Sequence, residues 1–96
     1  MNLSDYHYKD LLDMKKAEFD KAVEEDKSNL GYIATLRNYM SLSYAEMQTT
    51  FYKLQESAIG SPEAEKLKTE MIAVMMSLEY KVAKLREKEQ SLQRTV

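Results

Sequence analysis

The residues of this chain that could carry acid–base or metal chemistry are few and far apart. His7 is the single histidine, and Asp10 follows it by three residues near the start of the chain. A protein zinc site takes three or four ligands, and there is no second histidine and no cysteine to complete one. We therefore expect His7 to be a solvated side chain on the first helical turn, and we predict that the chain holds no metal or other cofactor.

Acidic residues are plentiful, but they form no catalytic pattern. Glu24, Glu25 and Asp26 make a short cluster that suits a cation or a basic partner, although a solvated helix face is the interpretation that we prefer. Neither a glycine-rich phosphate loop nor the Glu-x-x-His pattern of di-metal bundles occurs. We predict that the protein is not an enzyme.

Binding to nucleic acid would need a basic surface. The bases between residues 81 and 94 are interleaved with Glu79, Glu87 and Glu89, and the net charge of the chain is −2. The positive field of this segment is therefore diluted. We expect no nucleic-acid partner, and a helical hairpin that binds RNA is the alternative that the sequence leaves open.

The elements that carry these residues are predicted to be long helices. Two glycines and one proline in 96 residues leave few turns, and residues that favour helix dominate. Gly60 suits the left-handed position after a helix, Ser61 suits an N-cap, and Pro62 suits the first position of a new helix. We predict an all-α fold built on an antiparallel helical hairpin, with helices over about 29–59 and 62–93.

An N-terminal helix is predicted over about 5–26, with Ser4 as its N-cap. A break near 27–29, with Ser28 or Asn29 capping the next helix, is favoured over a helix that continues into the hairpin. The expected architecture is one helical domain over 1–96. It is either a three-helix bundle or a dimeric bundle resembling a coiled coil.

Apolar residues recur every three or four positions along both arms of the hairpin, which predicts two packed seams. The seam of the first arm runs from Leu30 to Ala58 and includes Met47, and that of the second runs from Ala64 to Leu92 and includes Val74. A second stripe lies beside each seam, and one neighbouring helix cannot cover it. We predict that these residues are either core beneath the N-terminal helix or a partner-binding surface: Tyr32, Tyr39, Leu42, Ile72, Met75, Met76, Tyr80 and Ala83.

No signal peptide is visible at the start of the chain, and the apolar run from Met71 to Leu78 is far shorter than the roughly 20 residues that a membrane span needs. We therefore expect a soluble, cytoplasmic protein that has no contact with a membrane.

The function that we predict is a non-enzymatic protein–protein interaction module. It would be a helical adaptor, a small chaperone or an assembly subunit that binds a partner helix or its own copy through an apolar face rich in Met and Tyr. The stretch from Ser61-Pro62 to Leu92 resembles components of type III secretion and their chaperones, which also join long amphipathic helices by a Pro-containing turn. This fold-level resemblance covers only the hairpin, and it implies a component or chaperone of a bacterial secretion apparatus as a further alternative.

Overall fold

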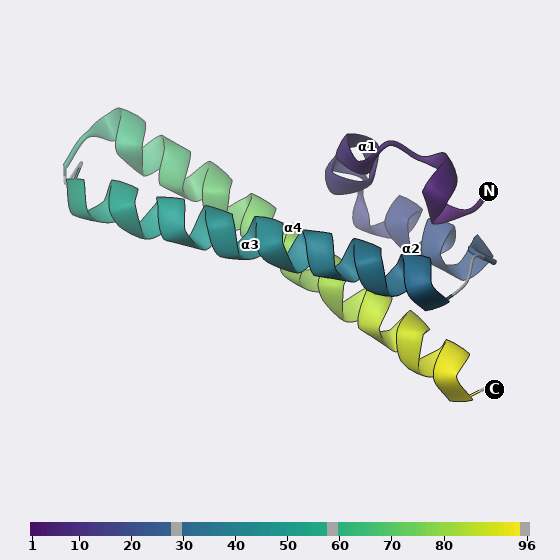
Figure 1. The fold of residues 1–96 in the computed structure, drawn as a ribbon. Coiled ribbons are helices and arrows are strands. Elements are labelled where there is room, and N and C mark those ends of the chain that lie inside the picture. Colours follow the sequence, from purple (N-terminus) through teal and green to yellow (C-terminus); the bar gives the residue numbers. More distant parts are fainter. Residues whose placement is uncertain (28–29, 58–59, 95–96) are drawn as a thin grey trace.

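A computed structural model describes residues 1–27, 30–57 and 60–94 of the chain (Figure 1). Within those ranges the regular elements are all helical. They are a 3-10 turn η1 (Leu3–Asp5) and four α-helices: α1 (Tyr8–Asp13), α2 (Lys16–Glu25), α3 (Leu30–Ser57) and α4 (Pro62–Arg94). The predicted all-α class is confirmed.

The predicted hairpin is confirmed as well. Figure 1 shows α3 and α4 running side by side in opposite directions, joined at one end of an elongated molecule of 53 × 20 × 17 Å. At the tip Gly60 has a φ of +84°, a left-handed conformation that glycine adopts without strain. The hydroxyl of Ser61 accepts a hydrogen bond of 3.4 Å from the backbone N–H of Ala64, and Pro62 is the first residue of α4. Residues 58 and 59 of the predicted first arm lie outside the described part.

The prediction of a single N-terminal helix over 5–26 is wrong. This segment is divided into η1, α1 and α2. Extended backbone at Tyr6 and His7 separates η1 from α1, and extended backbone at Met14 and Lys15, with ψ of 137° and 156°, separates α1 from α2. Asn2 takes the capping position of η1, and Ser4 lies inside that turn. Helix α2 ends at Glu25, before the start of α3 at Leu30, so the predicted break is confirmed, while the proposed caps Ser28 and Asn29 are outside the described residues.

A lysine from the other end of the chain provides the physical reason for the division. The Lys81 ammonium donates hydrogen bonds to the backbone carbonyls of Leu11 at 2.9 Å and Leu12 at 2.7 Å. In one continuous helix those carbonyls would accept from the N–H groups four residues later in the chain. Because Lys81 takes that place, α1 ends there, and α2 starts in a new direction.

The core lies at the open end of the hairpin, where α1 and α2 cover α3 and α4 (Figure 1). We call residues 30–43 and 77–94 the inner half of the hairpin and residues 44–57 and 62–76 the outer half. Apart from Ala64 and Met71, the buried apolar side chains among the described residues belong to the N-terminal elements or the inner half. They are Leu3, Leu11, Phe19, Ala22, Val23, Ile33, Leu36, Met40, Leu78, Val82 and Leu85.

Polar contacts also join the N-terminal elements to one another and α3 to α4. The backbone N–H of Leu3 donates to Asp26 Oδ1 at 2.8 Å, and the backbone N–H of Lys27 donates to Asn2 Oδ1 at 2.7 Å. Between the arms, Arg37 of α3 forms an ion pair of 2.6 Å with Glu89 of α4. The N-terminal elements therefore form one packed unit with the inner half, and no described residue covers the outer half in the same way.

Replacing the buried lysine tests this arrangement. In Lys81→Met the carbonyls of Leu11 and Leu12 lose their donor, so we expect the free energy of unfolding to fall by about 1–3 kcal/mol, the cost of leaving buried acceptors unpaired. Urea unfolding followed by circular dichroism measures it. Lys84→Met, on the same helix, is the matched control. It removes a surface contact to Glu87 of 3.7 Å and should stay within about 0.5 kcal/mol. Equal losses in the two variants would contradict the role of Lys81.

Candidate functional site

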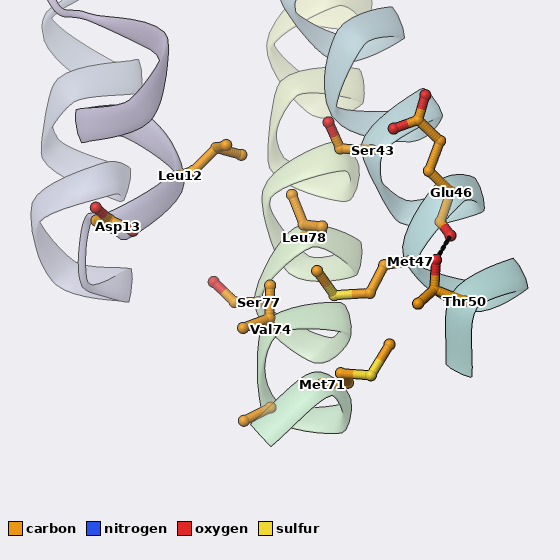
Figure 2. Close-up of a pocket in the computed structure, with 11 residues that line it drawn as sticks. Leu12, Asp13, Ser43, Glu46, Met47, Thr50, Met71, Val74, Ser77 and Leu78 are labelled. Atoms are coloured by element: carbon orange, nitrogen blue, oxygen red, sulfur yellow. Dashed lines mark hydrogen bonds between the residues drawn. The ribbon is translucent and has the colours of Figure 1, made fainter. Parts of the chain in front are cut away.

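One hollow of the described structure is a groove that starts where α1 ends. It lies between α1, α3 and α4, with a volume of about 680 Å³ (Figure 2). We call it the groove. Its lining combines apolar side chains with small hydroxyls and two carboxylates: Leu12, Asp13, Ser43, Glu46, Met47, Thr50, Met71, Ala73, Val74, Ser77 and Leu78.

Helical spacing explains which side of the hairpin the groove occupies. Val74 and Ser77 precede Lys81 by seven and four residues on α4, so all three share one face of that helix. The hydrogen bond from Lys81 to Leu11 shows that this face of α4 is turned to α1. Val74 and Ser77, on the same face, line the groove. Leu12 and Asp13, the last residues of α1, form the inner end of the groove, as Figure 2 shows. The groove therefore continues the layer that α1 begins.

The charged side chains that line the groove are both acidic. Asp13 and Glu46 are exposed, and no lysine, arginine or histidine is among the lining residues of the described structure. Burial lowers the pKa of the Lys81 ammonium from its usual value, and the negative charge of Asp13 opposes that shift. Lys81 is itself only 1% exposed and is bound to two carbonyls, so it gives the groove no accessible positive charge.

A second hollow of about 430 Å³ lies across the ridge formed by Ser43 and Glu46. It brings together the three residues of α3 that the sequence predicts as a partner surface: Tyr32, Tyr39 and Leu42. Tyr8 of α1 joins them, since its ring meets that of Tyr39 edge-on at 6.2 Å and its hydroxyl lies 2.8 Å from Ser43 Oγ. Burial, followed by the nearby Asp26 carboxylate, raises the pKa of the Tyr32 phenol.

The five predicted residues of α4 do not form one surface. Tyr80 is turned to α2, where its hydroxyl donates to both Asp20 carboxylate oxygens, at 2.6 and 2.8 Å, and the Lys16 ammonium lies 4.5 Å from the ring centre. Ile72 and Met76 are 45% and 65% exposed. Met75 is half-buried, and Ala83 lines a third hollow beside Ser41 and Tyr44. The N-terminal elements therefore cover one end of this stripe and leave the other open.

Sequence reasoning missed the groove because its residues were assigned to the buried seams. Met47 and Val74 belong to the predicted seams and both line the groove, yet Val74 is 45% exposed. Residues at intervals of three and four cover a broad arc of a helix, and only packing decides which edge faces the partner. The serines that interrupt the apolar stripes, Ser43 and Ser77, are the signal that could have marked this edge.

The described residues offer no group of three or more His, Cys, Asp or Glu side chains that could hold a metal ion. Among the helices searched, none combines the length and the hydropathy needed to cross a bilayer. Comparison of the chain with models of protein families, with curated proteins and with solved structures finds no match. What the groove offers chemically is an open apolar channel with acidic edges, which suits the side chains of another helix.

The contact between Tyr80 and Asp20 predicts an unusual titration. The hydrogen bond to Asp20 is the main cause that raises the pKa of Tyr80 from 10.0 to about 12. Folding thus favours the neutral phenol, and this contribution to stability is fully present below pH 10.0 and lost as the pH rises through about 12. We expect the tyrosinate absorbance of the parent minus that of Tyr80→Phe to titrate with a midpoint of about 12.

Tyr52→Phe provides the matched control, because Tyr52 is 55% exposed on the outer half. A difference titration for Tyr80 with a midpoint at the ordinary tyrosine value of 10.0 would show that Tyr80 does not bind Asp20 in solution.

Proposed function

We propose that this protein is a non-enzymatic interaction module that receives a helix from a partner protein in the groove. The bound helix would take the position of a third helix over the outer half, in line with the layer that α1 and α2 form over the inner half. The observation that carries the proposal is that this layer stops at Leu12 and Asp13 while α3 and α4 continue beyond it.

The energetics of a two-helix hairpin support this proposal. Ordering a residue costs about 1–2 kcal/mol of conformational entropy, which two helices alone barely offset by burial. The outer half has few buried apolar residues and exposes Leu67, Ile72, Val74 and Met76. A helix packed along the groove would bury Val74 and the edges of Met47 and Met71. Methionine adapts to partners of irregular shape, which suits this role.

The predicted surfaces outside the groove stay predictions. Tyr39 and Leu42 are 56% and 53% exposed in the second hollow, so a large partner could contact both hollows across the ridge of Ser43 and Glu46. Ile72 and Met76 are open enough to pack against a second copy of the chain. A secretion component or chaperone is compatible with the same helix-binding role.

Panning the full chain against a displayed library of amphipathic helical peptides tests the proposal. We expect the recovered peptides to bind Val74→Gln at least about tenfold more weakly, because burial of a valine side chain is worth about 1.5 kcal/mol or more. Met76→Gln is the matched control. It also replaces an exposed apolar side chain of α4, but Met76 is not part of the groove lining. Binding to this control should be unchanged.

The opposite pattern, with binding lost in Met76→Gln and kept in Val74→Gln, would move the docking surface to the other side of α4. Salt-sensitive binding of the chain to generic RNA, with no peptides recovered, would replace the proposal with the nucleic-acid alternative. Circular dichroism of both variants must show the helicity of the parent chain, because α4 is expected to stay folded in each.

A further inference from the structure

We infer that the helix received by the groove is a basic amphipathic one, with an apolar stripe flanked by lysine or arginine side chains. This inference rests on the proposed function and adds the chemistry of the partner. It follows from the charges at the edges of the groove, the end of α1 that closes it, and its length.

The edges of the groove carry one sign of charge. Asp13 of α1 and Glu46 of α3 lie on its lining, and Figure 2 shows them on opposite sides of α4. Glu46 also borders the second hollow, whose lining among the described residues likewise includes no base. A partner with basic flanks would place a positive charge near each carboxylate. A partner with acidic flanks would bring like charges together in a partly desolvated channel, which costs affinity.

The inner end of the groove strengthens the preference for a cation. The C-terminal end of a helix carries a partial negative charge, which a further carboxylate makes less favourable and a cation makes more favourable. Asp13 is the last residue of α1 and adds its charge at that end. The Lys81 ammonium offsets part of this negative charge. It is buried, however, and bound to the carbonyls of Leu11 and Leu12. Asp13 itself is exposed and lines the groove.

The size of the groove sets the length of the contact. On α4 its lining runs from Met71 to Leu78, and on α3 from Ser43 to Thr50, which is about 10 Å along each helix at 1.5 Å per residue. Two turns of a partner helix would fill it, with flanking residues just beyond. The apolar positions that it meets include Met47, Met71 and Val74, and Ser43, Thr50 and Ser77 line the groove as well.

Two fluorescent peptides of about three helical turns test the inference. They share one leucine stripe and differ only in their flanking residues, which are lysines in one and glutamates in the other. Fluorescence anisotropy with the full chain should show binding of the lysine peptide that is at least about tenfold tighter, or about 1.4 kcal/mol. In the double variant Asp13→Lys, Glu46→Lys the order of the two peptides should reverse. The matched control, Glu63→Lys with Glu65→Lys, changes the net charge equally at the tip, outside the groove lining, and should keep the parental order.

Each other outcome separates the inference from the proposed function. Equal binding of both peptides, weakened by Val74→Gln but not by Met76→Gln, overturns the choice of a basic partner and leaves the groove as a docking site. Binding of neither peptide overturns both claims. A dimer in light scattering that Val74→Gln dissociates identifies a second copy as the occupant and overturns the inference. If the control variant Glu63→Lys, Glu65→Lys also reverses the order of the two peptides, binding responds to net charge alone, and the inference is overturned.

Discussion

The structure depends on one buried ammonium. Moving a lysine out of water costs several kcal/mol unless its charge is met by good acceptors. Lys81 meets that requirement with the carbonyls of Leu11 and Leu12, which a short helix leaves unpaired at its C-terminal end. The side chain also lies over the Phe19 ring, with its nitrogen 5.5 Å from the ring centre. These contacts join α4 to both α1 and α2, so one residue determines where the N-terminal layer ends.

The position of that end decides what the rest of the hairpin can do. Because the extended backbone at Met14 and Lys15 separates α1 from α2, these two short helices cover only the inner half, and the main core lies there. The outer half keeps the length of a long hairpin without the third layer that would bury its apolar edges. The inner half thus holds the main core, while the outer half carries the exposed apolar side chains proposed for binding. The groove lies at the boundary between the two halves.

The hairpin could be predicted from sequence because its signals are local. Gly60, Ser61 and Pro62 each favour a backbone state that the turn requires, and the structure places all three as expected. The gathering of Tyr32, Tyr39 and Leu42 in one hollow also follows from their spacing on α3.

The break between α1 and α2 could not be predicted in this way. No glycine or proline marks Met14 and Lys15, and the residue that takes the place of the helical N–H groups is about seventy positions away in the sequence. The contact that covers Tyr80 could not be predicted for a similar reason, since its partner Asp20 comes from a helix whose direction the break determines. Val74 fits a buried seam by spacing, and its exposure follows from the missing third layer over the outer half.

Amide hydrogen exchange at Lys15 and Lys16, resolved by nuclear magnetic resonance, tests the central claim most directly. If Lys81 takes the carbonyls of Leu11 and Leu12, the two N–H groups that would bond to them in a continuous helix have lost those acceptors. The account predicts that both amides exchange nearly as fast as in an unfolded chain, while the amide of Phe19, which donates to the Lys15 carbonyl at 2.9 Å, is protected. Protection of Lys15 and Lys16 equal to that of Phe19 would reveal an unbroken helix and contradict it.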